Sequence, residues 1–465
     1  MLAGTARTAS AVRRHVPYRL PGSSTSRGKA IAQSQVGAHR RLTTSALKKG
    51  QKQKLVVLGT GWGSFRTLCD LDYSTYDVTV ISPRNHFLFT PLLASTTTGV
   101  LEFRSIMETI RPADQKYQFF QGHARDIDFD NRKIMCSEWI NPDRTFEMQY
   151  DKLVIGIGAD NNTFDIPGVK GNVYFLKELS DARAIRNRII ELLEEASIPS
   201  ISREERRRLL NFVIVGGGPT GVEFAAELSD FFWADVLKYY PSIHVNELKV
   251  TLVEAGDSIL SAFTKTLVEQ AMKNFKRQGV DMKLHTKVKE VKPGKILLDD
   301  GSELDCGMIV WSTGVGPRKL VRDLKDRIEL GPGGRILVDD HLRMKAHPEV
   351  FALGDCAVIE GTPLQATAQV ANQQGQYLAK QLNGKLAVDS SKHTVRFQYY
   401  PLGLMAYIGS YKSILDSSVF KGTGWLEFLA WRSVYLTRLG SMKSKMMVPY
   451  NWLKTLFWGR DVTHF

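Results

Sequence analysis

Residues 54–64 read KLVVLGTGWGS, and residues 211–221 read NFVIVGGGPTG. In each stretch a short apolar run ends in a glycine-rich turn, and a helix-like segment follows. A buried strand, a glycine-rich turn and the start of a helix together cradle the pyrophosphate of a dinucleotide. One such motif is weak evidence, but two with the right flanks predict two dinucleotide-binding units in one chain.

The glycines of such a turn have different tasks. The first allows the tight turn, the second lets the backbone approach the pyrophosphate, and the third lets helix and strand pack closely. The second motif is complete, whereas Ser64 stands at the third position of the first, where its small side chain should still fit. The predicted turn residues are Gly59, Gly61, Trp62 and Gly63 in the first motif and Gly216, Gly218, Pro219, Thr220 and Gly221 in the second.

The residue that ends the next strand separates the two motifs. After the second motif, the run KVTLVEA carries Glu254, whose carboxylate would bind both ribose hydroxyls and repel a 2′-phosphate, so NADH is favoured over NADPH. After the first motif the corresponding residue is Ser82, which predicts a different dinucleotide. Gly354 and Asp355 in LGDCA are expected to help there, since an aspartate between a strand and a helix can bind the ribityl chain of a flavin.

Strand-like and helix-like segments alternate along the chain in two series. This pattern predicts an α/β fold with two Rossmann-like domains, the second inserted in the first, and a C-terminal amphipathic segment. Two dinucleotides imply hydride transfer from a nicotinamide to a flavin. The expected bounds are 1–50 for a transit peptide, 53–165 and 310–385 for an FAD-binding domain, 166–309 for an NADH-binding domain, and 386–465 for a membrane-association region.

The formal net charge of +14 is concentrated at the N-terminus. Residues 1–50 contain ten Lys and Arg and no acid, and the rest of the chain carries 52 basic and 48 acidic residues. This balance removes the reason to expect nucleic-acid binding. The basic, Ser- and Ala-rich segment is typical of a mitochondrial transit peptide, and a disordered basic tail is the alternative.

The four cysteines, Cys69, Cys136, Cys306 and Cys356, form no C-x-x-C pair. Their wide spacing predicts neither a disulfide framework nor a zinc site, and it disfavours a dithiol reductase. The ten histidines show no metal-ligand spacing, so no metal is expected. No apolar run reaches the roughly 18 residues of a membrane-spanning helix.

Several stretches together resemble the type II, or alternative, NADH:ubiquinone oxidoreductases of mitochondria and bacteria. Besides the two turns, they include SPRNHFLFTPLLASTTTGVLEFRSI, WSTGVG, LGDCA, ATAQVANQQGQYLAK and WLKTLFWGRD. The resemblance runs from about Lys54 to the C-terminus. It implies FAD in the first domain, NADH in the second, and transfer of electrons to membrane ubiquinone without proton pumping.

The resemblance also assigns expected roles to single residues. Glu223 would lie near the contact between nicotinamide and flavin, and Gln369 and Gln373 would line the quinone pocket from one helix face. Asn372 stands where some relatives carry His, which makes proton delivery through an imidazole doubtful. The remaining expected contacts are Ser82, Pro83, Arg84, Asn85, Gly158, Gly354 and Asp355 for FAD, and Gly314 for NADH.

The segment 421–460 carries seven Lys and Arg, one acid, and four tryptophans, Trp425, Trp431, Trp452 and Trp458. Apolar rings among scattered bases are typical of a helix that lies in a membrane interface. A core-packing or dimer-interface segment is the alternative, and a homodimer is expected. The predicted location is the mitochondrial inner membrane, bound peripherally and on the matrix side.

Two other functions stay open at this stage. A sulfide:quinone oxidoreductase shares the predicted fold but needs cysteines over the flavin, and Cys136 and Cys306 stand on apparent strands. A flavoprotein that mainly binds a partner in response to NADH would show poor quinone turnover. Replacement of the cysteines distinguishes a sulfide:quinone oxidoreductase from an NADH:quinone oxidoreductase. Reoxidation of the flavin by quinone distinguishes the NADH-responsive binding protein from either enzyme.

Overall fold

Two large sheets organise the computed structural model, which describes residues 52–386 and 395–464. The expected transit peptide, 1–50, lies outside the described residues. The first sheet has the order β21-β8-β1-β2-β5-β6-β7, in which the strands from β21 to β5 are parallel and the last two are antiparallel. Its strands are β1 (Gln53–Leu58), β2 (Tyr76–Ser82), β5 (Gln118–Asp128), β6 (Lys133–Glu138), β7 (Thr145–Gln149), β8 (Lys152–Ile155) and β21 (Val350–Ala352).

The second sheet is parallel throughout, with the order β10-β17-β11-β12-β13. All of its strands come from the part of the chain between β8 and β21, so the second domain is inserted in the first, as the sequence predicts. The last strand of this sheet along the chain, β17, pairs with β11 and ends at Trp311. The strands are β10 (Tyr174–Phe175), β11 (Asn211–Val215), β12 (Lys249–Val253), β13 (Asp281–Lys283) and β17 (Met308–Trp311).

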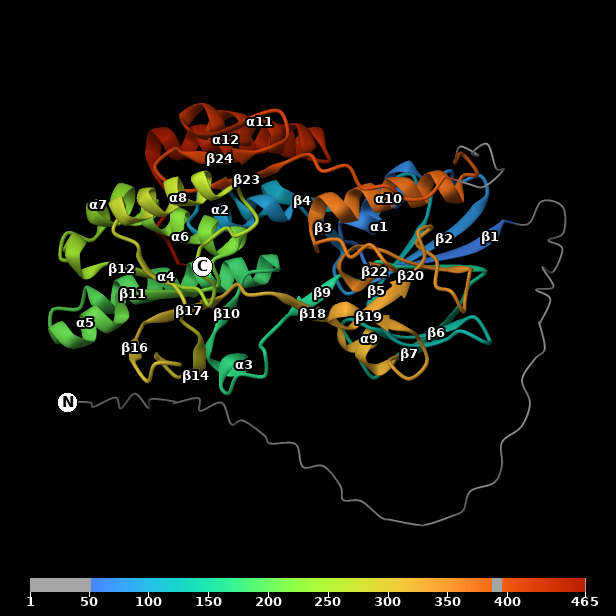
Figure 1. The fold of residues 1–465 in the computed structure, drawn as a ribbon, viewed down its shortest axis with the longest axis horizontal. Coiled ribbons are helices and arrows are strands. Elements are labelled where there is room, and N and C mark those ends of the chain that lie inside the picture. The colour runs from blue at the N-terminus through green and yellow to red at the C-terminus, as the bar shows by residue number, and fades with distance from the viewer. Residues whose placement is uncertain (1–51, 387–394, 465) are drawn as a thin grey trace, which may run out of the picture. The chain divides into compact units, whose positions relative to one another are not determined.

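Helices cover both sheets (Figure 1). Those of the two dinucleotide-binding domains are α1 (Trp62–Asp70), α2 (Leu93–Thr97), α3 (Val169–Asn172), α4 (Leu179–Ala196), α5 (Arg203–Leu209), α6 (Pro219–Phe231), α7 (Leu237–Tyr239), α8 (Lys265–Arg277), α9 (Lys319–Asp323) and α10 (Ala368–Leu382). A π-helical turn, Phe232–Val236, continues α6.

Shorter sheets complete the two domains. They are formed by β3 (His86–Leu88) with β4 (Met107–Thr109), β9 (Ala159–Asn161) with β18 (Val315–Pro317), β14 (Val288–Lys292) with β15 (Lys295–Leu298) and β16 (Glu303–Asp305), and β19 (Leu330–Gly331) with β20 (Arg335–Val338) and β22 (Ala357–Ile359). The chain crosses from the first domain to the second through β9 and returns through β18. These two strands pair antiparallel and so join the two crossovers between the domains.

Helices α1 and α10 lie side by side although some 300 residues separate them in sequence (Figure 1). Small residues allow this approach: a Cβ on Gly375 would lie 2.3 Å from the carbonyl oxygen of Gly63, and the Thr67 hydroxyl donates to the carbonyl of Gly375. Close packing of the two backbones holds the start of α1 next to the start of α10. Both helices begin at the cleft described below.

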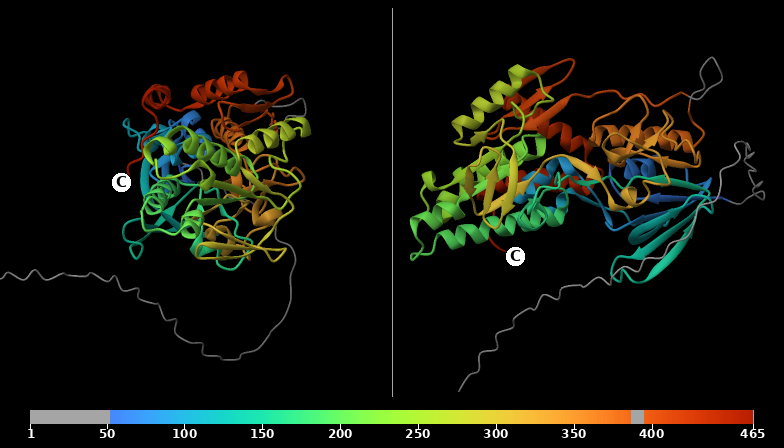
Figure 2. Two further views of the ribbon diagram at one scale, coloured as in Figure 1. Left: turned by 90° about the vertical axis from the view of Figure 1, so that its left-hand side faces the viewer. Right: turned by 60° about the horizontal axis from the view of Figure 1, so that its bottom comes forward.

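The C-terminal region is a small module of its own. It consists of the antiparallel strands β23 (Leu404–Tyr407), β24 (Ser413–Asp416) and β25 (Lys421–Gly424), followed by α11 (Trp425–Arg438) and α12 (Met442–Trp458). This module contacts α6 and α8 of the second domain, and Figure 2 shows its helices from two further sides. Its buried side chains belong to the same hydrophobic cluster as those of α4 and α6.

The module corrects one prediction about the tryptophans. Trp431 and Trp452 are buried because they pack into this hydrophobic cluster, and the Arg432 guanidinium lies 4.5 Å from the Trp452 ring. Trp425 and Trp458 are 59% and 74% exposed. Only the second pair is therefore placed where an interfacial side chain could act. No helix among the described residues is long and apolar enough to cross a membrane.

Candidate active site

Both glycine-rich turns line one cleft with a volume of about 830 Å³. The first domain contributes the turn after β1, and the second contributes the start of α6. Each turn comes directly after the carboxyl end of a parallel strand. In open α/β sheets this is the edge at which ligands bind. Of the predicted site residues, Gly59, Gly61, Trp62, Gly63, Ser82, Pro83, Arg84, Gly158, Gly354, Asp355, Gly218, Pro219, Thr220, Glu223 and Gly314 line this cleft.

The first turn has the backbone geometry that its glycines suggest. Gly59 has φ +95°, and a Cβ there would lie 2.4 Å from the carbonyl oxygen of Gly156. At Gly61 the nearest atom to a Cβ would be 3.9 Å away, so this glycine leaves open space for a phosphate. Ser64 fits at the third position because its neighbour Gly156 has no side chain, and the two interact through a 3.4 Å hydrogen bond.

The second turn repeats this arrangement. Gly216 has φ +112°, no atom lies within 4 Å of the place that a Cβ on Gly218 would take, and a Cβ on Gly221 would lie 2.1 Å from the Gly216 carbonyl oxygen. Glu254 directly follows β12 beside this turn and accepts hydrogen bonds from the amides of Gly217 and Gly256 at 2.5 and 2.7 Å. Its carboxylate is thus fixed at the rim of the turn, outside the lining of the cleft.

Asp355 lies in a 3-10 turn, Gly354–Cys356, at the end of β21. The expected helix does not follow directly, because β22 comes next and α10 begins only at Ala368. The N-terminus of α10 nevertheless borders the cleft through Thr367 and Ala368, and the Thr367 hydroxyl caps it. A helix N-terminus attracts negative charge, so the cleft offers a second favourable place for a phosphate or an electron-rich ring.

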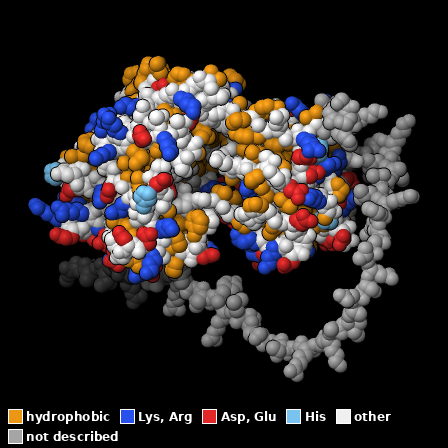
Figure 3. Space-filling view, viewed as in Figure 1, with side chains coloured by type: hydrophobic (Ala, Val, Ile, Leu, Met, Phe, Trp, Pro, Cys, Tyr) orange, Lys and Arg blue, Asp and Glu red, His pale blue; other side chains and the backbone are white. Residues whose placement is uncertain are grey.

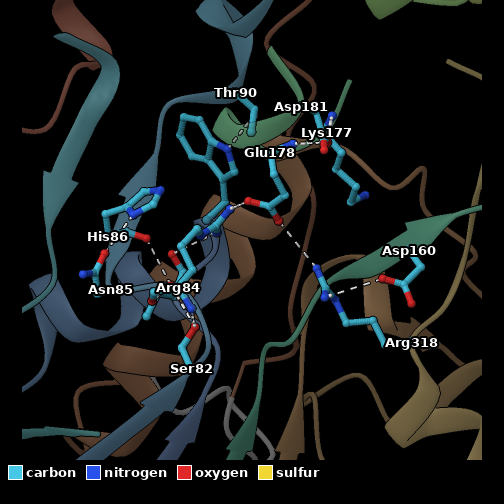
Figure 4. A network of polar contacts seen from close by, with 12 residues as sticks. Ser82, Arg84, Asn85, His86, Thr90, Asp160, Lys177, Glu178, Asp181 and Arg318 are labelled. Carbon is cyan, nitrogen blue, oxygen red and sulfur yellow. Dashed lines mark hydrogen bonds and ion pairs between the residues drawn. The ribbon is translucent and has the colours of Figure 1, made fainter. Parts of the chain in front are cut away.

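A chain of alternating charges crosses the cleft (Figure 4). Arg84 binds one oxygen of Glu178 at 2.9 Å, and Arg318 approaches the other at 3.7 Å and Asp160 at 3.5 Å. Glu178 is also the N-cap of α4, where it forms a capping box with Asp181. The network therefore connects the loop after β2 with both crossovers between the domains.

Lys177 also lines this part of the cleft (Figure 4). Burial lowers the pKa of its ammonium group, and the nearby Asp355 acts in the opposite direction. The sequence motifs do not predict Lys177, Glu178, Asp160 or Arg318 as site residues. A signal for one of them is present in the sequence, because E-L-S-D at 178–181 has the spacing of a capping box.

Glu223 lines the cleft and also contacts the C-terminal module. Its side chain is buried, burial raises its pKa to about 8, and its Oε1 accepts a 3.2 Å hydrogen bond from the amide of Tyr407 on β23. A row of aromatic rings connects this region with the first turn. Successive ring centroids lie 5.0 to 6.0 Å apart in the series Trp62, Phe89, Tyr435, Trp431 and Tyr407.

Two of the predicted quinone-pocket residues, Gln369 and Gln373, contact the backbone of the segment before β23. The amide of Gln369 donates to the Gly403 carbonyl, and Gln373 both donates to and accepts from the backbone of Tyr400. These contacts hold the segment before β23 on α10. The predicted residues that do not line the cleft are Asn85, Gly216, Gly221, Glu254, Gln369, Asn372 and Gln373.

No cysteine is among the residues that line the cleft in the described part of the chain. Cys136 on β6 and Cys306 are buried in different hydrophobic clusters, and Cys306 follows β16 rather than standing on a strand. The Cys356 thiol donates to the backbone carbonyls of Ile155 and Leu353. This arrangement does not favour a sulfide:quinone oxidoreductase, which needs cysteines at the flavin. Residues 52–386 and 395–464 also contain no group of His, Cys, Asp and Glu that could hold a metal ion.

Two pyrophosphate-type turns that face one cleft, without a thiol between them, define an α/β oxidoreductase that uses two dinucleotides. Comparison with known proteins agrees. The family model described as pyridine nucleotide-disulphide oxidoreductase matches residues 53–375, and the model described as NDH2 C-terminal domain matches residues 402–461. The chain belongs to this oxidoreductase family and, within it, to the type II NADH dehydrogenases.

Individual relatives match over almost their whole length. A probable NADH dehydrogenase of Dictyostelium discoideum is 46% identical over 439 residues, which cover 91% of this chain and 96% of the relative. The mitochondrial internal alternative NAD(P)H-ubiquinone oxidoreductase A1 of Arabidopsis thaliana is 43% identical over 445 residues, with 90% and 86% covered. The structure of NDH2 from Plasmodium falciparum in complex with NADH has a TM-score of 0.84 and 26% identity, and covers 89% of this chain and 100% of that one.

Proposed function

We propose that this protein transfers electrons from NADH through FAD to ubiquinone, without pumping protons. The observation that carries the proposal is the single cleft lined by both dinucleotide turns. Two dinucleotides bound there would meet face to face, as direct hydride transfer requires. The names of the relatives, which are NADH or NAD(P)H-ubiquinone oxidoreductases, support the same reaction.

The residues of the first domain fit FAD. The open space at Gly61 and the N-termini of α1 and α10 would accept its pyrophosphate, and Asp355 would bind its ribityl chain. Bound in this way, FAD would accept a hydride from NADH and pass two electrons to the quinone. Gly218 and the start of α6 would hold NADH on the other side of the cleft, and Glu223 would face the region between the two rings.

Flavin absorbance in stopped flow tests the function directly. Mixing the FAD-loaded protein with NADH should bleach the flavin, and a short-chain ubiquinone should then restore its absorbance within the time of one turnover. Bleaching without recovery on any quinone would contradict the proposal and favour an NADH-responsive binding protein. The Cys136→Ala, Cys306→Ala, Cys356→Ala triple variant should retain quinone reduction, because none of these thiols reaches the cleft.

Glu254→Gln should narrow the preference for NADH over NADPH by about tenfold or more. The negative charge at the rim of the second turn, which would repel a 2′-phosphate, is lost, while the side chain keeps its size. The ratio of kcat/KM for the two nucleotides measures the effect. Glu269→Gln, an exposed carboxylate on α8, serves as the control. An unchanged ratio in Glu254→Gln would contradict the assignment.

The C-terminal module supports peripheral binding to a membrane. Exposed apolar side chains run along one side of α12, and no acid is exposed on α11 or α12. Figure 3 shows hydrophobic side chains gathered at the edge of the molecule where these helices lie. An apolar face beside scattered cations is what an interfacial helix requires. The exposed apolar residues of α12 are Met442, Met446, Met447, Tyr450, Leu453, Leu456, Phe457 and Trp458.

Replacing Met446 and Leu453 together by Glu should reduce binding to liposomes by at least about tenfold. Two charges would be placed in the face that enters the interface, and each opposes transfer from water. Co-sedimentation with liposomes measures the binding, and the melting temperature should not change because both side chains contact solvent. Ile140→Glu, at an 85% exposed position far from this module in sequence, is the matched control. Equal loss in both variants would contradict a membrane face on α12.

We further propose the mitochondrial inner membrane as the location, with the matrix side favoured, and a homodimer as the assembly. The mitochondrial relatives and the basic, acid-free residues 1–50 support the organelle. Gln369, Asn372 and Gln373 remain predicted quinone-site residues. The contacts of Gln369 and Gln373 with Gly403 and Tyr400 suggest that these two would act by holding the segment that leads into β23.

A further inference from the structure

Tyr407 connects three parts of the protein that meet beside the cleft. Its amide donates to Glu223 near the start of α6, and its hydroxyl donates to Asp230, two turns further along the same helix, at 2.5 Å. Its ring lies 5.8 Å from that of Trp431 on α11. Tyr407 itself is buried and does not line the cleft. It can therefore influence the reaction only through the residues that it holds.

The turn after Tyr407 is held in an unfavourable backbone conformation. Ser410 and Tyr411 have φ values of 52° and 55°, in the left-handed region that costs free energy for residues other than glycine. Asp230 holds this turn by accepting from the Ser410 amide at 2.9 Å, and the Asn274 amide donates to the carbonyl of Ile408. Strained residues persist only where surrounding contacts determine them. These contacts fix the end of β23 and therefore the position of the Tyr407 amide.

Few charged groups surround Glu223. Its neighbours that can titrate are Glu227 on α6, Tyr407 on β23 and Tyr435 on α11. Beyond these, Arg460, Arg432 and Asp230 act on Glu227. No cation contacts Glu223 among the described residues. Burial is the largest influence on its pKa and raises it, whereas the hydrogen bond from the Tyr407 amide lowers it. Water that reached the carboxyl group would weaken the effect of burial.

We propose that Tyr407 is a positioning residue for Glu223: its hydroxyl bond to Asp230 fixes β23 on α6 and keeps the carboxyl of Glu223 dry and oriented in the cleft. The C-terminal module is thereby coupled to the chemistry of the site. This inference rests on the role of Glu223 in the proposed NADH:quinone reaction. In the intact arrangement Glu223 is mostly protonated at neutral pH, with Oε1 occupied by the Tyr407 amide.

The pH dependence of quinone reduction tests this coupling. Wild-type activity should fall on the alkaline side as Glu223, with its pKa of about 8, loses its proton. This fall is the alkaline limb of the pH profile, and Glu223→Gln should abolish it. Tyr407→Phe removes the hydroxyl bond to Asp230, and Asp230→Ala removes this bond together with those from the Ser410 amide. Both variants should let water in and move the alkaline fall in activity down by about one pH unit or more. In the Glu223→Gln background, Tyr407→Phe should leave the profile unchanged.

Unfolding as a function of pH gives a readout that does not need turnover. The folded pKa of Glu223 lies above the value of 4.5 for a free side chain, so its contribution to stability is present below that value and lost as pH rises toward 8. The difference in melting temperature between wild type and Glu223→Gln should therefore change with pH over this range. When Tyr407→Phe is compared with the Tyr407→Phe, Glu223→Gln double variant, the difference in melting temperature should stop changing at a lower pH.

Tyr76→Phe is the matched control, because it also removes a buried tyrosine hydroxyl that donates to a backbone carbonyl at 2.8 Å, but far from α6. It should lower the melting temperature and leave the alkaline limb in place. The same behaviour in Tyr407→Phe would show a purely structural role and overturn the inference. Persistence of the limb in Glu223→Gln would instead refute the role of Glu223 in the proposed function, and the inference with it.

Discussion

Replacing Gly59 by alanine should give a protein that purifies without flavin and unfolds at a lower temperature. Gly59 has φ +95°, which a residue with a Cβ rarely adopts, and the added methyl group would lie 2.4 Å from the carbonyl oxygen of Gly156. Relief requires β1 to move away from the chain that follows β8. The turn would then lose the geometry that the pyrophosphate needs. The flavin absorbance relative to the protein absorbance measures the bound flavin.

Gly61→Ala tests the predicted phosphate contact without straining the backbone. The Gly61 backbone is extended, with φ −79°, and the nearest atom to a new Cβ would be 3.9 Å away, so the fold should tolerate alanine. The methyl group would enter the space left for a phosphate, and the affinity for FAD should fall by about tenfold or more. If Gly61→Ala kept full affinity for FAD, the pyrophosphate would not bind at this turn.

Replacing Arg460 by methionine should cause the largest loss of stability among single ion-pair variants, about 3–5 kcal/mol of the free energy of unfolding. Arg460 is only 9% exposed, and its guanidinium contacts Asp235 at 3.2 Å and Glu227 at 3.5 Å. Methionine fills a similar space but removes the ion pairs that Arg460 forms with two buried carboxylates. Because Arg460 follows α12, the loss should also loosen the C-terminal module from the end of α6.

Lys454→Met is the control for Arg460, because the Lys454 ammonium forms a 2.7 Å ion pair with Glu102 at the surface. Such exposed pairs contribute about 0–1 kcal/mol, so this variant should melt close to the wild type. Urea denaturation, followed by fluorescence, measures both variants. Equal effects would mean that the buried network around Arg460 contributes no more than a surface contact.

Much of the fold could be predicted from local pattern. The strand, turn and helix around Gly59 and Gly216 form as expected, because apolar runs, glycines and helix starts depend on near neighbours in sequence. The insertion of one domain in the other was also predictable, from the return of a strand and glycine pattern near Asp355.

The site was predictable only where a motif carries it. The turn glycines Gly59, Gly61 and Gly218 line the cleft, as do Asp355 and Glu223. Lys177 and Arg318 could not be predicted because each stands at a crossover between domains, and no local pattern marks such a position. The burial of Trp431 was left open by the sequence for a related reason: on composition alone, a buried aromatic ring and an interfacial one look the same.

The sequence by itself predicted two dinucleotides and, through Glu254 and Ser82, a difference between their two sites. These properties reside in short segments whose chemistry needs few distant partners. Only the tertiary structure decided that both turns open into one cleft, that burial raises the pKa of Glu223, and that Tyr407 and Asp230 hold it there. Burial and hydrogen bonding between segments far apart in the chain arise from packing, which the order of residues does not display.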